Sequence, residues 1–308
     1  MVRIGVVNID TSHPRSFATI LHKENRARYV AIYNDGFRTD EEVDGFMQEF
    51  SLEKRYNTLE ELADSVDIAF IQSCNWDRHL ELARPIIEKG KPVFIDKPIV
   101  GKLRDCFELE ELAKRGARIY GSSSLRYAEE YQNFICTPEE ERGTIVSVFT
   151  SCGVDEFNYG VHIMEGIHGM LGPGAYSVRY VGGGNRDRIY SETYSVKWSN
   201  GIQVFYQTMT GVWQPFEVSV QTTKGSYHFQ IDTTKIYKSM LDKILDAYKK
   251  DRELIPISHL TETIKIYLAG KASREKSGAE IKLDALELSD SGFDGYAFEK
   301  QYALQQGR

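Results

Sequence analysis

Apolar runs of strand length alternate with amphipathic segments of helical length through the first 124 residues. The apolar runs carry many β-branched residues, as buried strands of a parallel sheet do, and they span residues 3–9, 29–34, 67–73, 92–96 and 117–123. The segments between them have helical character and span 15–23, 39–50, 77–89 and 103–115. Strands separated by such helices predict right-handed crossovers and a parallel sheet covered on both faces. The alternation therefore predicts a Rossmann-like domain over residues 1–124.

The second half of the chain has a different pattern. Segments rich in Tyr, Val and Thr between residues 144 and 232 alternate in polarity and are separated by turn signals. Helices are predicted near 160–171, 235–250 and 258–277. The run GGGN at 182–185 reads as a hairpin turn, because no Gly-Lys-Ser/Thr helix start follows it. We expect a second domain of α+β type over 125–308, with an open and mainly antiparallel sheet, so that the whole chain is of the α/β class.

The composition excludes several classes of partner. Lys and Arg number 38 against 45 Asp and Glu, which leaves a net charge of −7 and disfavours non-specific binding to nucleic acid or anionic membranes. No stretch approaches the roughly 20 apolar residues of a membrane span, and the start MVRIGVVNID does not resemble a signal peptide. The four cysteines show no CxxC pairing, as expected for reduced thiols in the cytoplasm.

The predicted carboxyl ends of the strands carry the polar residues of the first domain. Ligands of an open α/β sheet bind at this edge, and the ends here read NIDTSHP, YNDG, SCNW and DKPI. The first of these stands where a dinucleotide-binding fold has its glycine-rich phosphate turn, and it contains no glycine. The backbone amides that begin the following helix remain available to an anion.

Three segments together resemble one family. They are residues 73–100, with GKPVFIDKP, residues 157–172, with GVHIMEGIH, and residues 259–283. Their order resembles the glucose–fructose oxidoreductase / inositol dehydrogenase / MocA family over nearly the whole chain. The resemblance implies an N-terminal Rossmann domain, a C-terminal α/β domain with an open sheet, a nicotinamide cofactor and assembly into homo-oligomers.

The resemblance also implies roles for individual residues. Lys97, in Asp96-Lys97-Pro98, corresponds to a lysine beside the nicotinamide and the substrate hydroxyl. His162 corresponds to the usual acid/base, with Asn158 and Glu165 in the same motif. Arg126 and Tyr127 stand where an arginine often lines the substrate cleft, although a salt bridge between the domains is an equal reading for Arg126, and His168 lies partly on the face of His162. The cofactor-binding set is Asn8, Asp10, Thr11, Ser12, His13, Asn34, Asp35, Ser73, Asn75, Asp96 and Lys97.

Two departures from the family pattern bear on the chemistry. Asn158 replaces an aspartate and cannot titrate, so it could orient His162 or hold a substrate hydroxyl without stabilising an imidazolium. In the phosphate turn, Asp10 would bring a negative charge towards the phosphates unless it turns away, while Thr11, Ser12 and His13 can donate hydrogen bonds. The alternative is that Asp10 and Ser12 only cap the first helix.

The preferred cofactor is NAD. An acidic residue at the end of the second strand, Asp35, favours NAD over a 2′-phosphate, while Arg38 nearby leaves NADP open.

The candidate catalytic residues have structural alternatives. A lysine near a desolvated site can have a lowered pKa and handle a hydroxyl proton, whereas the alternative for Lys97 is an ordinary solvated lysine. A metal site of His162, Glu165 and His168 is disfavoured, because the spacing is not HExxH. In a purely structural reading, Glu165 satisfies His162.

The sequence predicts an NAD(P)-dependent oxidoreductase acting on a hydroxyl of a sugar, cyclitol or related polyol. Two alternatives stay open: a ligand-binding or regulatory protein of this fold without turnover, and a lyase or hydrolase that retains its cofactor. The aromatic strands of the second domain predict a homodimer or homotetramer rather than a nucleic-acid platform, because no basic residues are interleaved with the aromatic ones.

Overall fold

The structure is a computed structural model and describes residues 1–121 and 123–307. The chain divides into two compact units, and each is discontinuous in sequence. The first contains residues 1–122, 237–257 and 294–308, and the second contains residues 123–236 and 258–293. The domains predicted from sequence, 1–124 and 125–308, differ from these units because two later segments pack with the first part of the chain. Residue 122, within the predicted strand 117–123, lies outside the described residues.

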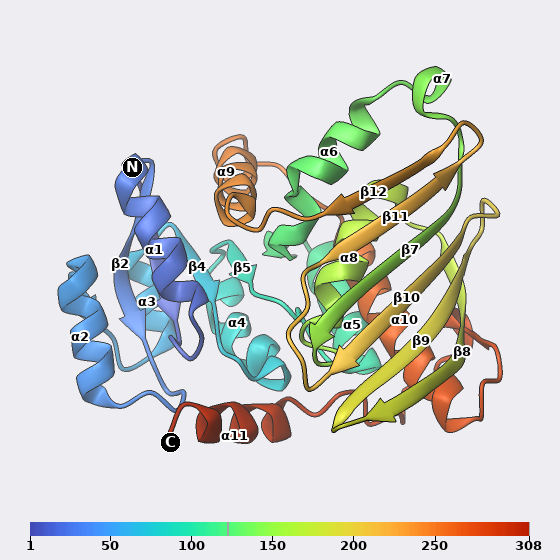
Figure 1. Ribbon diagram of the computed structural model, residues 1–308. Helices are drawn as coiled ribbons and strands as arrows, with labels where there is room; N and C mark the ends of the chain where they lie inside the picture. Colours follow the sequence, from blue (N-terminus) through green and yellow to red (C-terminus); the bar gives the residue numbers. More distant parts are fainter. Residues whose placement is uncertain (122, 308) are drawn as a thin grey trace. The chain divides into compact units, whose positions relative to one another are not determined.

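The first unit is built on a parallel six-stranded sheet with the order β3-β2-β1-β4-β5-β6 (Figure 1). The strands are β1 (Val2–Val7), β2 (Ala27–Tyr33), β3 (Lys54–Arg55), β4 (Ile68–Ile71), β5 (Val93–Ile95) and β6 (Ile119–Gly121). The connecting helices are α1 (His13–Glu24), α2 (Asp40–Phe50), α3 (Leu59–Ser65), α4 (His79–Glu88) and α5 (Leu103–Lys114), with a 3-10 turn η1 (Trp76–Arg78) before α4. The predicted Rossmann-like fold is confirmed.

Local sequence explains where these elements begin. α2 starts with a capping box in which the Thr39 side chain accepts from the Glu42 N–H and the Glu42 carboxylate accepts from the Thr39 N–H. The two central strands β1 and β4 are buried almost throughout, as the continuous apolar runs predict. The short β3 and α3 were not predicted.

Two C-terminal segments complete the first unit. Helix α9 (Ile236–Lys249) lies by α1, where Arg26 pairs with Asp242 at 2.6 Å and with Asp246, and Tyr237 packs edge-on against Phe17. Helix α11 (Gly295–Gln305) begins at Asp294, whose side chain accepts from the Ala297 N–H. This helix was not predicted from the sequence.

The second unit has a seven-stranded sheet with the order β12-β11-β7-β10-β9-β8-β13. Its strands are β7 (Ile145–Val154), β8 (Ala175–Arg186), β9 (Ile189–Trp198), β10 (Gln203–Thr210), β11 (Glu217–Thr222), β12 (Ser226–Gln230) and β13 (Ile281–Lys282). Within this sheet, β7 and β10 are the only described strands that pair in parallel, so the predicted mainly antiparallel sheet is confirmed. The prediction of a turn at 182–185 is wrong: these residues continue β8, and the hairpin turns at Asp187 and Arg188, both with positive φ.

Helices cover one face of this sheet (Figure 1). The covering helices include α8 (Gly160–Leu171) and α10 (Ile257–Glu275). The other described elements of this unit are η2 (Ser124–Tyr127), α6 (Glu129–Cys136), α7 (Glu139–Arg142) and η3 (Leu283–Ala285). The Tyr267 ring of α10 packs 5.2 Å from the Tyr206 ring of β10, and the Tyr267 hydroxyl donates to the Gly160 carbonyl of α8. Sheet, α10 and α8 therefore share one core.

No helix within residues 1–121 and 123–307 has both the length and the apolar character that crossing a bilayer demands.

Candidate functional site

The turn after β1 keeps the backbone conformation of a glycine turn without a glycine. Asn8 has a φ of 63°, in the left-handed region that Gly adopts freely and Asn tolerates better than most residues. Its N–H donates to the Tyr33 carbonyl (2.9 Å), and its side-chain Oδ1 accepts from the Asp35 N–H (2.9 Å). Asn8 therefore forms the turn and ties the end of β1 to the end of β2.

Asp10 stands two residues further along, where a second glycine would let a phosphate approach the backbone. Its side chain is fully buried, and Oδ2 accepts from the Cys74 N–H at 3.0 Å. Its Oδ1 lies so near Gly36 that a Cβ on that glycine would overlap it. The pKa of Asp10 is raised to about 6, mainly by burial; the Cys74 N–H opposes the rise and the Glu299 carboxylate adds to it. The carboxylate is turned into the protein, so the alternative in which Asp10 caps α1 is wrong.

The three residues that follow Asp10 make only local or inward contacts. The Thr11 Oγ1 accepts from the His13 N–H (3.2 Å), and Ser12 precedes α1 without a side-chain cap hydrogen bond. The His13 Nδ1 lies 2.7 Å from an Asp96 carboxylate oxygen, and its ring stacks on Phe17. The predicted capping of α1 by the Ser12 side chain is therefore wrong. His13, predicted as a phosphate donor, is held instead by the acid that precedes Lys97.

The residues after β5 fix the backbone of Lys97. Asp96 is buried, and one of its oxygens accepts from the Lys97 N–H at 2.8 Å while the other pairs with His13. Burial alone would raise the pKa of Asp96, but the attraction of His13 and Lys97 outweighs it and holds that pKa below the usual range. Asp96 is therefore an ionised anchor between the start of α1 and the end of β5.

Asn34 and Asp35 lie after β2, as predicted. The Asn34 Oδ1 accepts from the Ile9 N–H (3.3 Å), and Asp35 pairs with Arg78 at 2.7 Å. Burial would raise the pKa of Asp35, but the hydrogen bonds from Arg78 keep it below the usual range. Asp35 thus stays ionised, with its charge already shared by Arg78, a residue that the sequence did not single out.

Ser73 and Asn75 follow β4 and shape the next loop. The Ser73 Oγ accepts from the Asn75 N–H (3.1 Å), and the Asn75 Oδ1 accepts from the Asp77 N–H (3.1 Å). The other end of the Asn75 amide donates to the Glu299 carboxylate of α11 at 3.0 Å. Both predicted cofactor residues are buried, and their side chains bond to the protein.

A cavity of about 470 Å³ lies beside the first turn. Thr11, Ser12 and Arg38 line it, together with residues of α1, α2 and α11. Arg38 donates to the Asp10 carbonyl (2.8 Å) and to the Glu42 carboxylate (3.1 Å). The cavity therefore combines two hydroxyls with a guanidinium that is already engaged.

In the second unit, His162 is held by a residue that the sequence analysis missed. The Ser123 Oγ lies 2.5 Å from the His162 Nδ1, and the same Oγ accepts from the Leu125 N–H (3.1 Å). Asn158 donates to Asp155 at 3.5 Å, and the His162 ring packs 5.4 Å from the Phe216 ring. A hydroxyl rather than a carboxylate thus orients this imidazole.

Glu165 belongs to a different buried pair. Its carboxylate accepts from the Arg126 Nε at 2.8 Å and from the Thr263 hydroxyl at 2.9 Å, and both ionic side chains are almost fully buried. The structural reading in which Glu165 satisfies His162 is wrong, because the carboxylate faces Arg126. The salt bridge of Arg126 lies within the second unit, which corrects the reading of it as a bridge between domains. Tyr127, next to Arg126, is buried as well.

His168 makes contacts of its own. Its Nε2 lies 3.2 Å from the Glu262 carboxylate and its Nδ1 3.5 Å from the Arg126 guanidinium.

A different group has the geometry of metal ligands. Within residues 1–121 and 123–307 it consists of Asp10, Cys74 and Glu299, whose ligand atoms lie within 4.8 Å of one another. Lys97 and Asp96 belong to the first unit, and His162, Glu165 and His168 to the second.

The first unit carries a family match. Residues 2–123 match the model of the GFO_IDH_MocA oxidoreductase family, described as having an NAD-binding Rossmann fold. The resemblance noted in the sequence is confirmed over these residues. No curated protein matches the chain.

Solved structures of low identity share the fold of both units. Scyllo-inositol dehydrogenase from Lactobacillus casei, with bound NAD(H) and scyllo-inositol, has a TM-score of 0.75 at 15% identity over 92% of this chain and 99% of that one. An oxidoreductase from Thermotoga maritima has a TM-score of 0.77 at 14% identity, over 93% of this chain and 99% of that one. GenD2 from gentamicin A biosynthesis, in complex with NAD, has a TM-score of 0.77 at 15% identity, over 91% of this chain and 96% of that one.

Proposed function

We propose that this protein is an NAD-dependent oxidoreductase that transfers a hydride between nicotinamide and a hydroxyl-bearing carbon of a sugar, cyclitol or related polyol. The observation that carries the proposal is the family match of residues 2–123, which include the Asp96-Lys97-Pro98 turn at the end of β5. The neighbour from Lactobacillus casei binds scyllo-inositol, which supports a polyol as the substrate class.

The carboxyl edge of the first sheet offers groups that fit a dinucleotide. Asn8 supplies the left-handed turn, and the Asp10 carboxylate is buried and so does not face the surface. The side chains of Thr11 and Ser12 line the adjoining cavity. Asp35 would accept from the adenosine ribose and disfavour a 2′-phosphate. Arg38, the residue that would favour NADP, is engaged by Asp10 and Glu42. NAD is therefore the proposed cofactor.

The remaining predicted residues would manage the substrate. When bound, NAD supplies the acceptor for the hydride that leaves the substrate carbon as the carbonyl forms. Of Lys97 and His162, one would take the single hydroxyl proton while the other holds the hydroxyl, with Ser123 holding the imidazole by its Nδ1. Asn158, Tyr127 and His168 are proposed to contact or border the substrate. Glu165 is proposed to act through Arg126, because the two are paired.

Turnover tests the function. The purified protein is assayed for NAD reduction with a panel of cyclitols and sugars, alongside Lys97→Met. We expect a polyol-dependent rate in the native protein and a loss of at least about 100-fold in the variant, since a positioned acid/base contributes about that factor. Lys91→Met is the matched control, because the Lys91 amine bonds to the Val66 carbonyl at the amino ends of β4 and β5, away from their carboxyl ends.

Three other outcomes would change the conclusion. Unchanged turnover in Lys97→Met would contradict the role of Lys97. Binding of NAD and polyol without any reduction would support the ligand-binding alternative. Conversion of a substrate with no net change in the redox state of the cofactor would support the lyase or hydrolase alternative.

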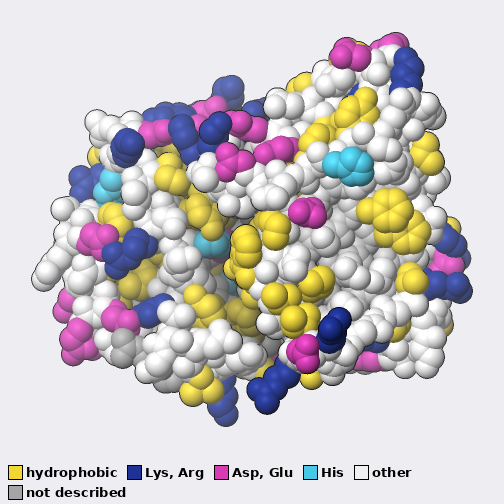
Figure 2. Space-filling view, in the orientation of Figure 1, with side chains coloured by type: hydrophobic (Ala, Val, Ile, Leu, Met, Phe, Trp, Pro, Cys, Tyr) yellow, Lys and Arg dark blue, Asp and Glu magenta, His cyan; other side chains and the backbone are white. Residues whose placement is uncertain are grey.

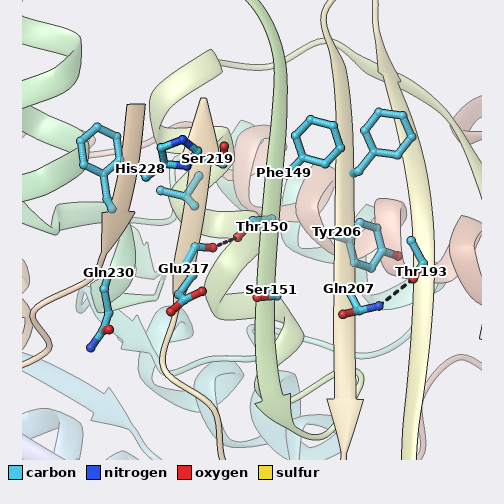
Figure 3. Close-up of a pocket in the computed structure, with 13 residues that line it drawn as sticks. Phe149, Thr150, Ser151, Thr193, Tyr206, Gln207, Glu217, Ser219, His228 and Gln230 are labelled. Atoms are coloured by element: carbon cyan, nitrogen blue, oxygen red, sulfur yellow. Dashed lines mark hydrogen bonds between the residues drawn. The ribbon is translucent and has the colours of Figure 1, made fainter. Parts of the chain in front are cut away.

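We also propose a homo-oligomer, most simply a dimer, that packs the open sheet of one copy on that of another. The sheet face opposite the helices carries a hollow of about 500 Å³, lined by residues of β7, β9, β10, β11 and β12 (Figure 3). A local group of hydrophobic side chains lies over these strands among side chains of other kinds (Figure 2), and the exposed Phe149 stacks on Phe205 with ring centres 4.9 Å apart. An aromatic sheet face of this kind is typical of an interface. A cytoplasmic location is also proposed, on the ground that no disulfide joins the four cysteines in the described part of the chain.

A further inference from the structure

Helix α11 lies across loops that follow three strands of the first sheet (Figure 1). The Phe298 ring packs 4.9 Å from the Trp76 ring after β4, and the Tyr302 ring packs 6.1 Å from the Phe37 ring after β2. Between them, Glu299 accepts from the Asn75 amide and lies within 4.8 Å of the ligand atoms of Asp10. One helix therefore contacts the loops after β1, β2 and β4.

The N-terminus of α11 is seated closely on the loop after β4. The Gly295 N–H donates to the Asp77 carboxylate at 3.1 Å. A Cβ on Gly295 would overlap the Asn75 Oδ1 and lie 2.9 Å from the Asp77 nitrogen. Its φ does not lie in the left-handed region, so the position needs glycine for space and not for backbone conformation.

These contacts cover the place where the strand order reverses. The sheet runs outward in one direction from β1 through β2 to β3, and in the other from β4 through β5 to β6. Ligands of such sheets lie in the crevice outside the carboxyl ends of the two central strands. Here the Asp10 side chain bridges the ends of β1 and β4 by its bond to Cys74, and α11 lies over it. Helix α11 therefore occupies part of this crevice and lines the cavity beside Thr11 and Ser12.

We propose that α11 and a dinucleotide compete for this edge, so that α11 must leave its seat before the cofactor binds. The competition rests on the proposed function. Its physical form is a two-state equilibrium, in which the apparent dissociation constant equals the intrinsic one divided by the fraction of molecules with α11 displaced. By reciprocity, a bound dinucleotide displaces α11 by the same factor.

The docking of α11 is shallow enough to be reversed. Gly295 is the only residue of the helix that is buried, whereas Phe298, Glu299 and Tyr302 stay partly accessible. Glu299 also places a second carboxylate near Asp10, and like charges in contact reduce the net gain of docking. Elements with few buried apolar contacts open at low free-energy cost.

The experiment measures α11 and the cofactor separately in the full-length protein. Amide hydrogen exchange of residues 295–305 is followed with and without saturating NAD, and the NAD dissociation constant is measured by calorimetry. The variants are Gly295→Ala, which obstructs the seat while favouring helix, and Phe298→Ala, which removes the contact with Trp76. Leu304→Ala is the control, because Leu304 lies on the exposed side of α11.

We expect NAD to accelerate exchange in α11, and we expect Gly295→Ala and Phe298→Ala to bind NAD about three- to tenfold more tightly than the native protein, with Leu304→Ala unchanged. NAD binding that leaves the exchange of α11 unchanged or slower overturns the competition alone. The same holds if both variants bind NAD no better than Leu304→Ala. If neither the native protein nor any variant binds NAD at millimolar concentration, the proposed function fails and the competition fails with it.

Discussion

Asn8 shows how a single residue replaces a glycine in the turn after β1. The position requires a positive φ, and asparagine adopts it at a lower cost than most side chains. Its amide oxygen also accepts from the Asp35 N–H, a contact that glycine could not make. The loss of the glycine pattern therefore prevents a phosphate from approaching the backbone closely at Asp10, but it does not change the shape of the turn.

Asp10→Asn tests the charge that replaces the second glycine. Because the pKa of Asp10 is raised from 3.8 to about 6 in the folded state, the folded protein binds more protons than the unfolded chain between these values. Its stability therefore falls as the pH rises from about 4 to about 6 and stays reduced above that. An amide keeps the acceptor for the Cys74 N–H and does not ionise.

We expect Asp10→Asn to raise the free energy of unfolding above pH 6 by up to about 3 kcal/mol, and to change it little near pH 4. Urea unfolding at pH 4.5 and pH 7.5 measures the difference. A gain that is equal at both pH values would show that the carboxylate is not the source of the cost. Asp44→Asn, on α2 at the surface, is the control.

At the scale of elements, η2, α8 and α10 are joined by one buried ion pair. Arg126 of η2 meets Glu165 of α8, and Thr263 of α10 donates to the same carboxylate. Removing one partner of such a pair leaves a buried charge without compensation. We expect Arg126→Met to lower the free energy of unfolding by about 3–5 kcal/mol.

Adding Glu165→Gln to Arg126→Met tests the reason for that loss. The amide removes the uncompensated charge and still accepts from Thr263, so the double variant should recover a substantial part of the stability. Urea unfolding of the two single variants and the double variant forms the cycle. Additive losses would mean that the two side chains do not act as a pair.

The sequence predicts elements whose signal is local and misses those defined by distant contacts. The parallel strands and their helices in the first unit followed from apolar runs and helical periods, and the motifs brought out Lys97 and His162. The two residues of β3 and the seven of α3 are too short for a periodic signal. The seat of α11 depends on Trp76 and Phe37, more than 200 residues earlier in the chain.

The partners of the candidate site residues could not be predicted for the same reason. Ser123 approaches His162, and Arg126 approaches Glu165, each across 39 residues of sequence. Spacing within a helix places Glu165 one turn from His162, but the arginine on η2 decides where the carboxylate points. Tertiary packing selects among contacts that the local pattern allows.

For the whole molecule, Phe149→Lys tests the proposed assembly. Phe149 is 46% exposed on the open sheet face, and a lysine there would place a charge within the proposed interface. We expect sedimentation at micromolar concentration to change from the oligomer to the monomer. Leu288→Lys, an exposed apolar position outside the sheet, should leave the oligomer intact. A native protein that sediments as a monomer would reject the assembly itself.

The division of the first unit into three sequence segments has a consequence for how the protein is made. Residues 237–257 and 294–308 belong to that unit, so residues 123–236 and 258–293 of the second unit are synthesised before the first unit has all its parts. Until α9 and α11 are synthesised, the segment from β1 to β6 has an exposed surface that these two helices later cover. Chains stalled before residue 237 should therefore engage chaperones and be digested by protease in the N-terminal segment, whereas full-length chains should resist.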